Sequence, residues 1–282
     1  MHPRWTVAAM LPALVASSAL FLGPNGSASR PESVTLGAAL PFTGSVAPFE
    51  EPRGGEPVSI AVFTQYVPPV PKPRPAVASW TPPAGYRVIP SPIYRQTMPL
   101  DCETSALRMG LATFGHYYSD ATLFKLEPVD SRAPVMGPNH TVVHWGDPYT
   151  SFVGNVWGSD WTPTGYGIYY PIIVSIARSH GLPGTTGGEG YRASTIYAAL
   201  RAGHPVEVWI ETAFRPTTVR TWTAWDGRSV RYSYAEHAVL LSGVSSTSVR
   251  VNDPLYGSQY WVSRATFERS WRDFNNMAVI FQ

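Results

Sequence analysis

Proline confines the foldable part of this chain to its last two thirds. From Arg30 to about Ser91 the sequence is rich in Pro, Gly, Ala and Ser, and the stretch YVPPVPKPRPAVASWTPPAGYRVIPSP contains nine prolines. Proline removes a backbone donor and favours extended polyproline conformations, so we expect residues 30–91 to form a low-order spacer. A pro-region removed on maturation is the alternative. Residues 92–282 are then left to bury a core, and they are numerous enough to do so.

The first thirty residues resemble an export signal. His2 and Arg4 give a short basic start, a mostly apolar run follows from Trp5 to Leu22, and small residues surround Ala28. An uncleaved membrane anchor is the alternative, because the apolar run approaches the ~18 residues that begin to span a bilayer. The small residues that end the run favour cleavage. The sequence therefore predicts a signal peptide over 1–29, a secreted or extracytoplasmic protein, and no further transmembrane segment.

Composition narrows the class of protein further. The formal net charge is +2, from 21 Lys and Arg against 19 Asp and Glu, and no lysine-rich run is present. This near balance of charge argues against a nucleic-acid partner. The chain has one cysteine, Cys102, so it cannot form an intramolecular disulfide even if it is exported. Its stability must come from an ordinary hydrophobic core.

Residues 92–282 have the patterning of an α+β domain. Helices are predicted over 101–114, 169–181 and 194–203, with Asp101 capping the first and Pro171 opening the second. Residues 205–213 alternate as a strand with Val206, Val208 and Ile210 on one side. Four more strands are predicted over 237–244, 248–253, 259–263 and 276–281. Helices followed by strands suggest an antiparallel sheet packed on a helical part.

Cys102 lies at the first position of a predicted helix. Unpaired amides and the helix dipole favour a thiolate there, which suits a nucleophile. Asp101 and Glu103 beside it raise a thiol pKa, so a cationic partner is needed, and histidine is the usual one. Gln96 lies six residues upstream, and Pro99 keeps it out of the helix. Its amide could therefore fold back beside the Cys102 amide to form an oxyanion hole.

His237 is the best-placed histidine for such a partnership. It opens a predicted strand and lies 135 residues after Cys102, within the ~130–150 expected of papain-type cysteine proteases. Asp253 ends the next strand, where it could fix the histidine tautomer. A purely structural His237–Asp253 pair is the alternative. His140 and His144 have metal-ligand spacing but lack a nearby cysteine or carboxylate cluster, so we predict no metal and no cofactor.

Five segments, in this order, resemble the bacterial papain-like cysteine peptidases related to the double-glycine leader peptidases of bacteriocin export. These segments are QTMPLDCETSALRMGL, GYGIYYPIIVSIARSHGL, LRAGHPVEVWI, HAVLLSGV and VNDP, and the resemblance covers about Pro92 to Gln282. It implies a papain-like fold, in which a helical part carries the cysteine and an antiparallel sheet carries the histidine and aspartate.

The resemblance also implies site residues. Cys102 would be the nucleophile and His237 the general base and acid, with Asp253 orienting His237 and Gln96 supplying the oxyanion hole. Glu103 and Thr104 stand where the family usually has Gly-Pro after the cysteine. Transporter helices are absent, so leader cleavage coupled to export is not implied.

Three functions remain open on the sequence. The preferred one is a secreted cysteine peptidase that hydrolyses peptide bonds of peptide or protein substrates. An acyl-transfer enzyme or cell-wall amidase on the same scaffold needs the same groups, and a catalytically silent peptide-binding domain needs none. The complete set of Cys102, His237 and Asp253 argues against the silent domain. Association with the cell wall or cell surface is also left open.

Overall fold

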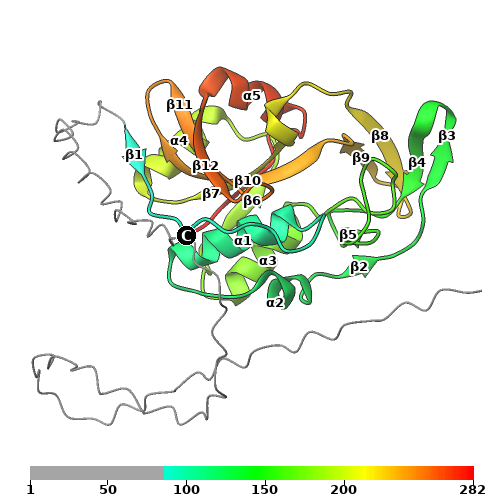
Figure 1. Cartoon of the computed structure of the whole chain (residues 1–282), viewed down its shortest axis with the longest axis horizontal. Coiled ribbons are helices and arrows are strands. Elements are labelled where there is room, and N and C mark those ends of the chain that lie inside the picture. The colour runs from blue at the N-terminus through cyan, green and yellow to red at the C-terminus, as the bar shows by residue number, and fades with distance from the viewer. Residues whose placement is uncertain (1–85) are drawn as a thin grey trace, which may run out of the picture. The chain divides into compact units, whose positions relative to one another are not determined.

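The computed structural model describes residues 86–282 (Figure 1). The expected signal peptide over 1–29 lies outside the described residues, and so do residues 30–85 of the spacer expected over 30–91. The described part is a mixed domain of helices and mainly antiparallel strands, as the sequence predicted. Its sheet includes β1 (Arg87–Val88), which pairs with β10 and therefore begins upstream of the boundary expected at residue 92. No helix among residues 86–282 is long and apolar enough to cross a membrane.

One large sheet organises the domain. Its strand order is β12-β11-β10-β7-β13-β6, with β1 beside β10, and every pairing in it is antiparallel. The strands are β6 (Thr186–Gly188), β7 (Val206–Glu211), β10 (Glu236–Val244), β11 (Ser248–Asp253), β12 (Ser258–Ser263) and β13 (Ala278–Ile280). Since β10 and β11 are antiparallel neighbours, the start of β10 lies at the same end of the sheet as the end of β11.

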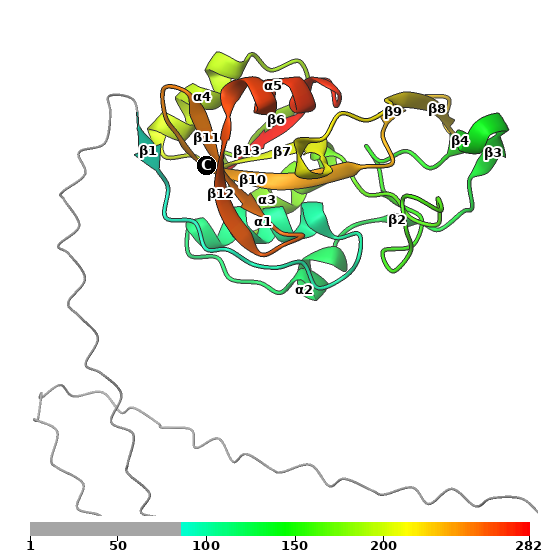
Figure 2. The ribbon, with the colours of Figure 1, turned by 45° about the horizontal axis from the view of Figure 1, so that its top comes forward.

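Helices cover both faces of this sheet (Figures 1 and 2). Val206, Val208 and Ile210 of β7 share one face, as predicted, and pack in a core cluster with side chains of α4 and α5. Trp209 on the opposite face joins a second cluster with α1 and α3. All six residues of β7 are buried, because this strand has helices above and below it.

The helices begin and end at residues that explain their limits. They are α1 (Cys102–Thr113), α2 (Asp120–Phe124), α3 (Tyr170–Ser179), α4 (Ala193–Ala202) and α5 (Arg264–Arg272). Pro171 stands in the first turn of α3, and Gly203 caps α4 with φ +99°, a left-handed conformation that glycine adopts without strain. The sequence pattern did not predict α5, which lies between two strands and begins with a Ser263 cap.

The cap expected from Asp101 is wrong. Asp101 does occupy the position before α1, but its side chain makes no hydrogen bond to the helix. Its Oδ1 accepts the backbone N–H of Met98 at 3.1 Å instead, so the carboxylate braces the preceding turn. Burial, and then the nearby Asp120 carboxylate, raises the pKa of Asp101 to about 7.

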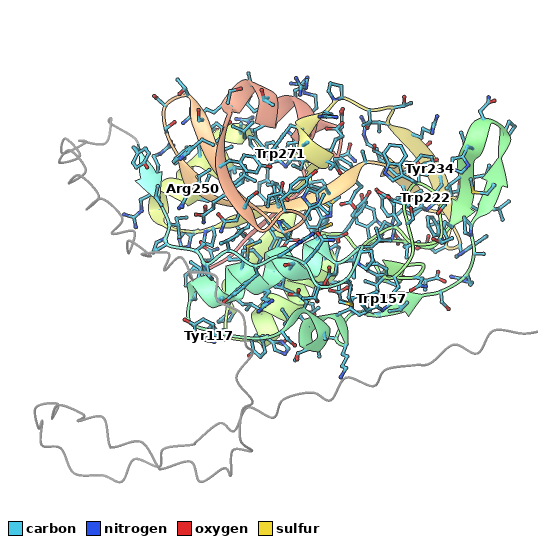
Figure 3. All side chains as sticks on the ribbon, in the orientation of Figure 1. Tyr117, Trp157, Trp222, Tyr234, Arg250 and Trp271 are labelled. Carbon is cyan, nitrogen blue, oxygen red and sulfur yellow. The ribbon has the colours of Figure 1, made fainter. Side chains whose placement is uncertain are left out.

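A smaller sheet extends the domain at one end. It consists of β3 (Val135–Gly137), β4 (Thr141–Trp145), β8 (Arg220–Ala224) and β9 (Ser229–Tyr232), in that order. A further pair, β2 (Val129–Asp130) with β5 (Phe152–Val153), lies beside it, and two short 3₁₀ turns are Pro138–His140 and Thr212–Phe214. Trp222 lies at this end together with Tyr234 (Figure 3). The Trp222 ring contacts Trp145, Tyr166 and Tyr232, which ties the small sheet to the core.

Candidate active site

Cys102 is the first residue of α1, and it faces β10. The residue is 6% exposed, and its thiol is free. Its Sγ donates to Oε2 of Glu103 at 3.1 Å and accepts the backbone N–H of Ala238 at 3.4 Å. Burial, followed by the Glu103 and Glu236 carboxyls, raises the pKa of the Cys102 thiol well above its ordinary value. At rest, therefore, the thiol is protonated.

His237 and Asp253 form a buried pair at the end of the sheet where β10 starts and β11 finishes. His237 Nε2 lies 2.8 Å from Asp253 Oδ1, and both side chains are almost fully buried. Tyr260 donates its O–H to the other carboxylate oxygen at 2.8 Å, and the backbone N–H of Leu255 donates to Oδ1. Burial alone would raise the pKa of Asp253, but its bonds to His237 and Tyr260 outweigh burial and lower it.

The structure places Cys102 and His237 around one pocket. Ala238, whose N–H contacts the thiol, is the residue next to His237 on β10. The pocket has a volume of about 190 Å³, and its lining residues are Gln96, Pro99, Leu100, Cys102, Asp160, Trp161, Tyr166, Thr212, Glu236, His237 and Leu255. A larger pocket of about 390 Å³ lies near Asp130 and Trp225 and contains none of the predicted site residues. Chemistry rather than size identifies the smaller pocket as the candidate site.

Gln96 lines the pocket, but its amide points into its own turn. Nε2 donates to the carbonyl oxygens of Met98 at 3.1 Å and Pro99 at 2.8 Å, so both of its hydrogens are used. Its Oε1 is buried without a hydrogen-bond partner among the described residues. Donation toward Cys102 therefore requires a rotation of the amide group, and the oxyanion-hole role of Gln96 stays a prediction.

Two carboxyl groups beside the thiol were not assigned to the site from the sequence. Oε1 of Glu103 accepts the backbone N–H of Ile168 at 2.8 Å, and its pKa is raised by burial to about 7. Burial and the Glu103 carboxyl also raise the pKa of Glu236 well above its ordinary value. A Cβ at Gly167 would overlap Glu103 Oε1, so only glycine fits against this pair. Their positions directly after Cys102 and directly before His237 are the signal that could have identified them.

The same cluster has the residue types of a metal site. One ligand atom each from Cys102, Glu103 and Glu236 lies within 4.8 Å of the others. Both oxygens of Glu103 already accept hydrogen bonds, one from the Ile168 N–H and one from the thiol. His140 and His144 bond separate carbonyl groups, those of Trp161 and Thr223, and do not converge on a common point.

Comparison with known proteins finds a matching family and a similar sequence. The sequence pattern of the Peptidase_C39 like family matches residues 88–279. The uncharacterized protein YvpB of Bacillus subtilis (strain 168) is 29% identical over 182 residues, which are 64% of this chain and 68% of YvpB.

Two solved structures are also similar. A crystal structure of a protein from Bacillus anthracis assigned as a C39-like peptidase has a TM-score of 0.59 at 25% identity. The match covers 70% of this chain and 97% of that chain. A double glycine motif protease from an AMS/PCAT transporter, solved in complex with the leader peptide, has a TM-score of 0.39 at 15% identity. That match covers 69% of this chain and 93% of the protease chain.

Proposed function

This chain belongs to the Peptidase_C39 like family, and on that premise we propose that it is a cysteine peptidase that works through Cys102, His237 and Asp253. The observation that carries the proposal is the position of the His237–Asp253 pair. His237 lies on β10 directly before Ala238, which donates its backbone N–H to the Cys102 thiol, and Asp253 bonds His237 from the end of β11. Substrates are peptide or protein amides that enter the pocket beside these groups.

The proposed reaction begins with the neutral thiol. Because His237 Nε2 donates to Asp253, Nδ1 is the ring nitrogen free to accept the Cys102 proton. The thiolate attacks the amide carbonyl, and the tetrahedral oxyanion is held by the Cys102 backbone N–H at the start of α1 and by a rotated Gln96 amide. His237 then gives its proton to the departing amine. A water molecule, deprotonated by His237, hydrolyses the thioester and regenerates the thiol.

Asp253 stabilises the His237 imidazolium that forms in these reaction steps. Its carboxylate is ionised because its pKa is lowered, and it is held by Tyr260 and Leu255 as well as by His237. A fixed carboxylate of this kind sets the tautomer of the histidine and favours its charged form. Glu103 assists when it is protonated, since its O–H can then donate to the thiolate that its carboxylate would repel.

The cellular setting is proposed on the sequence alone. The basic start and apolar run of residues 1–29 support secretion, and residues 30–85 support a spacer or pro-region. An amidase or a transferase would differ from a peptidase in the substrate that enters the pocket and in the nucleophile that attacks the thioester.

The experiment that tests the function is cleavage of a library of internally quenched peptides by the full chain, with products identified by mass. Hydrolysis by the wild type, together with its loss in Cys102→Ala, supports the peptidase. The exposed Asp226→Asn variant is the control for changes unrelated to the pocket. Products that carry an added amine instead of water would identify a transferase, and no turnover of any peptide would contradict the proposal.

A further inference from the structure

The pocket beside Cys102 is acidic. Its lining includes the carboxyl groups of Asp160 and Glu236, and it includes no lysine or arginine. Leu100, Trp161 and Tyr166 supply apolar wall on other sides. A pocket of this composition accommodates an aliphatic chain along its wall and a positive charge at its acidic side.

Glu236 carries a hydrogen-bonding deficit. The residue is 7% exposed, and its Oε1 has no partner among the described residues. Leaving a buried carboxyl oxygen unpaired is costly, and a donor placed against it recovers that cost. Glu103 bonds the thiol and the Ile168 N–H and makes no hydrogen bond to Glu236 Oε1. A donor from a bound molecule can therefore pair with this oxygen.

Asp160 provides a second carboxyl group at the pocket wall. Its Oδ1 accepts the backbone N–H of Trp161 at 2.8 Å, which fixes the carboxylate at the pocket wall. Burial raises the pKa of Asp160 to about 6, so the group is mainly ionised at neutral pH. The Trp161 ring is 64% exposed beside it and offers a face to a cation.

We propose that this pocket selects a lysine or arginine side chain of the substrate next to the scissile bond, held between Asp160 and Glu236. The inference rests on the proposed peptidase function and names its substrate class. An ammonium or guanidinium group brings several N–H donors, which satisfy Glu236 Oε1 and pair with Asp160 at once. An apolar side chain of the same length fills the same space but brings no donor to either carboxyl group.

The first test measures binding without turnover. Full-length Cys102→Ala protein is titrated calorimetrically with capped pentapeptides of glycine that carry lysine, arginine, norleucine or citrulline at the centre. Norleucine and citrulline match the shapes of lysine and arginine without their charge. Because hydrogen bonds to charged groups carry most of the expected preference, the charged peptides should bind about tenfold more tightly or better.

The second test assigns that preference to the pocket. In Asp160→Asn the side chain can still accept the Trp161 N–H, so the loop keeps its anchor while the charge is lost. We expect the lysine-to-norleucine ratio to fall by about tenfold in Asp160→Asn, and to stay unchanged in Asp226→Asn, which removes the same charge outside this pocket. Thermal melting of both variants checks that they are folded. In protein that keeps Cys102, internally quenched versions of the peptides measure the same preference as the ratio of kcat/KM for the lysine peptide to kcat/KM for the norleucine peptide.

The outcomes separate this inference from the function it deepens. Equal binding of lysine and norleucine peptides, or a preference that survives in Asp160→Asn, overturns the cation pocket even if peptides are cleaved. Charge-selective binding without cleavage of any peptide supports the pocket and contradicts the peptidase.

Discussion

The contact between Glu103 and the Cys102 thiol makes a quantitative prediction about Glu103→Gln. Glutamine keeps the shape of the side chain. Its Oε1 can accept the Ile168 N–H as before, and its amide can donate to the sulfur. The substitution therefore removes one negative charge from beside the thiol and leaves the packing in place. We expect the pKa of Cys102 to fall.

The size of the effect follows from the 3.1 Å between Sγ and Glu103 Oε2. Two like charges at that distance repel by about 5 kcal/mol at an effective dielectric constant of ~20. This corresponds to roughly 4 pKa units if Glu103 is fully ionised. Glu103 is ionised at the high pH where the thiol titrates, because its own pKa is about 7. The substitution leaves the burial of the thiol and the neighbouring Glu236 carboxyl unchanged, and both continue to raise the thiol pKa. We expect the pKa of Cys102 to fall by at least about one unit.

The assay is the pH dependence of Cys102 alkylation by iodoacetamide, followed by intact mass. Glu127→Gln is the matched control, because Glu127 is a buried carboxyl bonded to Thr104 of the same helix and does not touch the thiol. The alkylation midpoint should move down in Glu103→Gln and remain in place in Glu127→Gln. An unchanged midpoint in Glu103→Gln would refute the claim that this carboxyl holds the thiol neutral.

Three further outcomes are expected. Asp253→Asn replaces a charge-assisted bond to His237 with a neutral one, so kcat/KM on any cleaved peptide should fall about 10- to 100-fold while KM changes little. Gly110→Ala places a Cβ 2.5 Å from the Phe281 ring, and thermal or urea unfolding should report a loss of about 1–3 kcal/mol. Stability should also depend on pH in an unusual direction. The pKa values of three buried carboxyls are raised to about 7, whereas carboxyls in the unfolded chain have an ordinary pKa of about 4. Between these two pH values the folded state keeps protons that the unfolded chain has released. Their stabilisation is complete below that value and is lost as pH rises through 7, so the melting temperature should fall between about pH 5 and pH 8, and a rise over that range would contradict the assignment. These three carboxyls are Asp101, Glu103 and Glu211.

The sequence predicted those parts of the fold that local rules determine. Pro171 and Gly203 mark a helix start and a helix end because each needs a particular backbone conformation. The alternation in β7 and the runs over β10 to β12 gave the antiparallel sheet correctly. The His237–Asp253 contact followed from the sheet as well, since two antiparallel neighbours bring the start of one strand beside the end of the next.

Contacts between distant residues set the limit of that prediction. Glu103 and Glu236 meet only after α1 packs on β10, and no periodicity in either segment indicates their approach. Asp101 has the residue type of a helix cap, but the turn before the helix competes for its carboxylate through the Met98 N–H. Gln96 lines the expected pocket. Whether its amide donates to the Pro99 carbonyl or points into the pocket depends on a side-chain torsion, which the spacing of residues in the sequence does not determine.

The smaller sheet was missed for a related reason. Its strands β4 and β8 pair in parallel across a separation of about eighty residues, and both are short. Trp145 and Trp222 hold them together through ring contact and not through a run of alternating residues. The residues between Pro128 and Gly167 contribute Asp160 and Trp161 to the wall of the pocket.

The most direct test of the central claim, that His237 activates Cys102, is the rate at which an epoxide-type probe labels Cys102 near neutral pH. Wild-type protein should label faster than free cysteine despite the burial of the thiol, and His237→Ala should slow labelling by about a hundredfold or more. His180→Ala, which removes a histidine at the end of α3 and away from the pocket, should label as the wild type does. Labelling of Cys102 no faster than free cysteine, or equally fast without His237, would contradict the account.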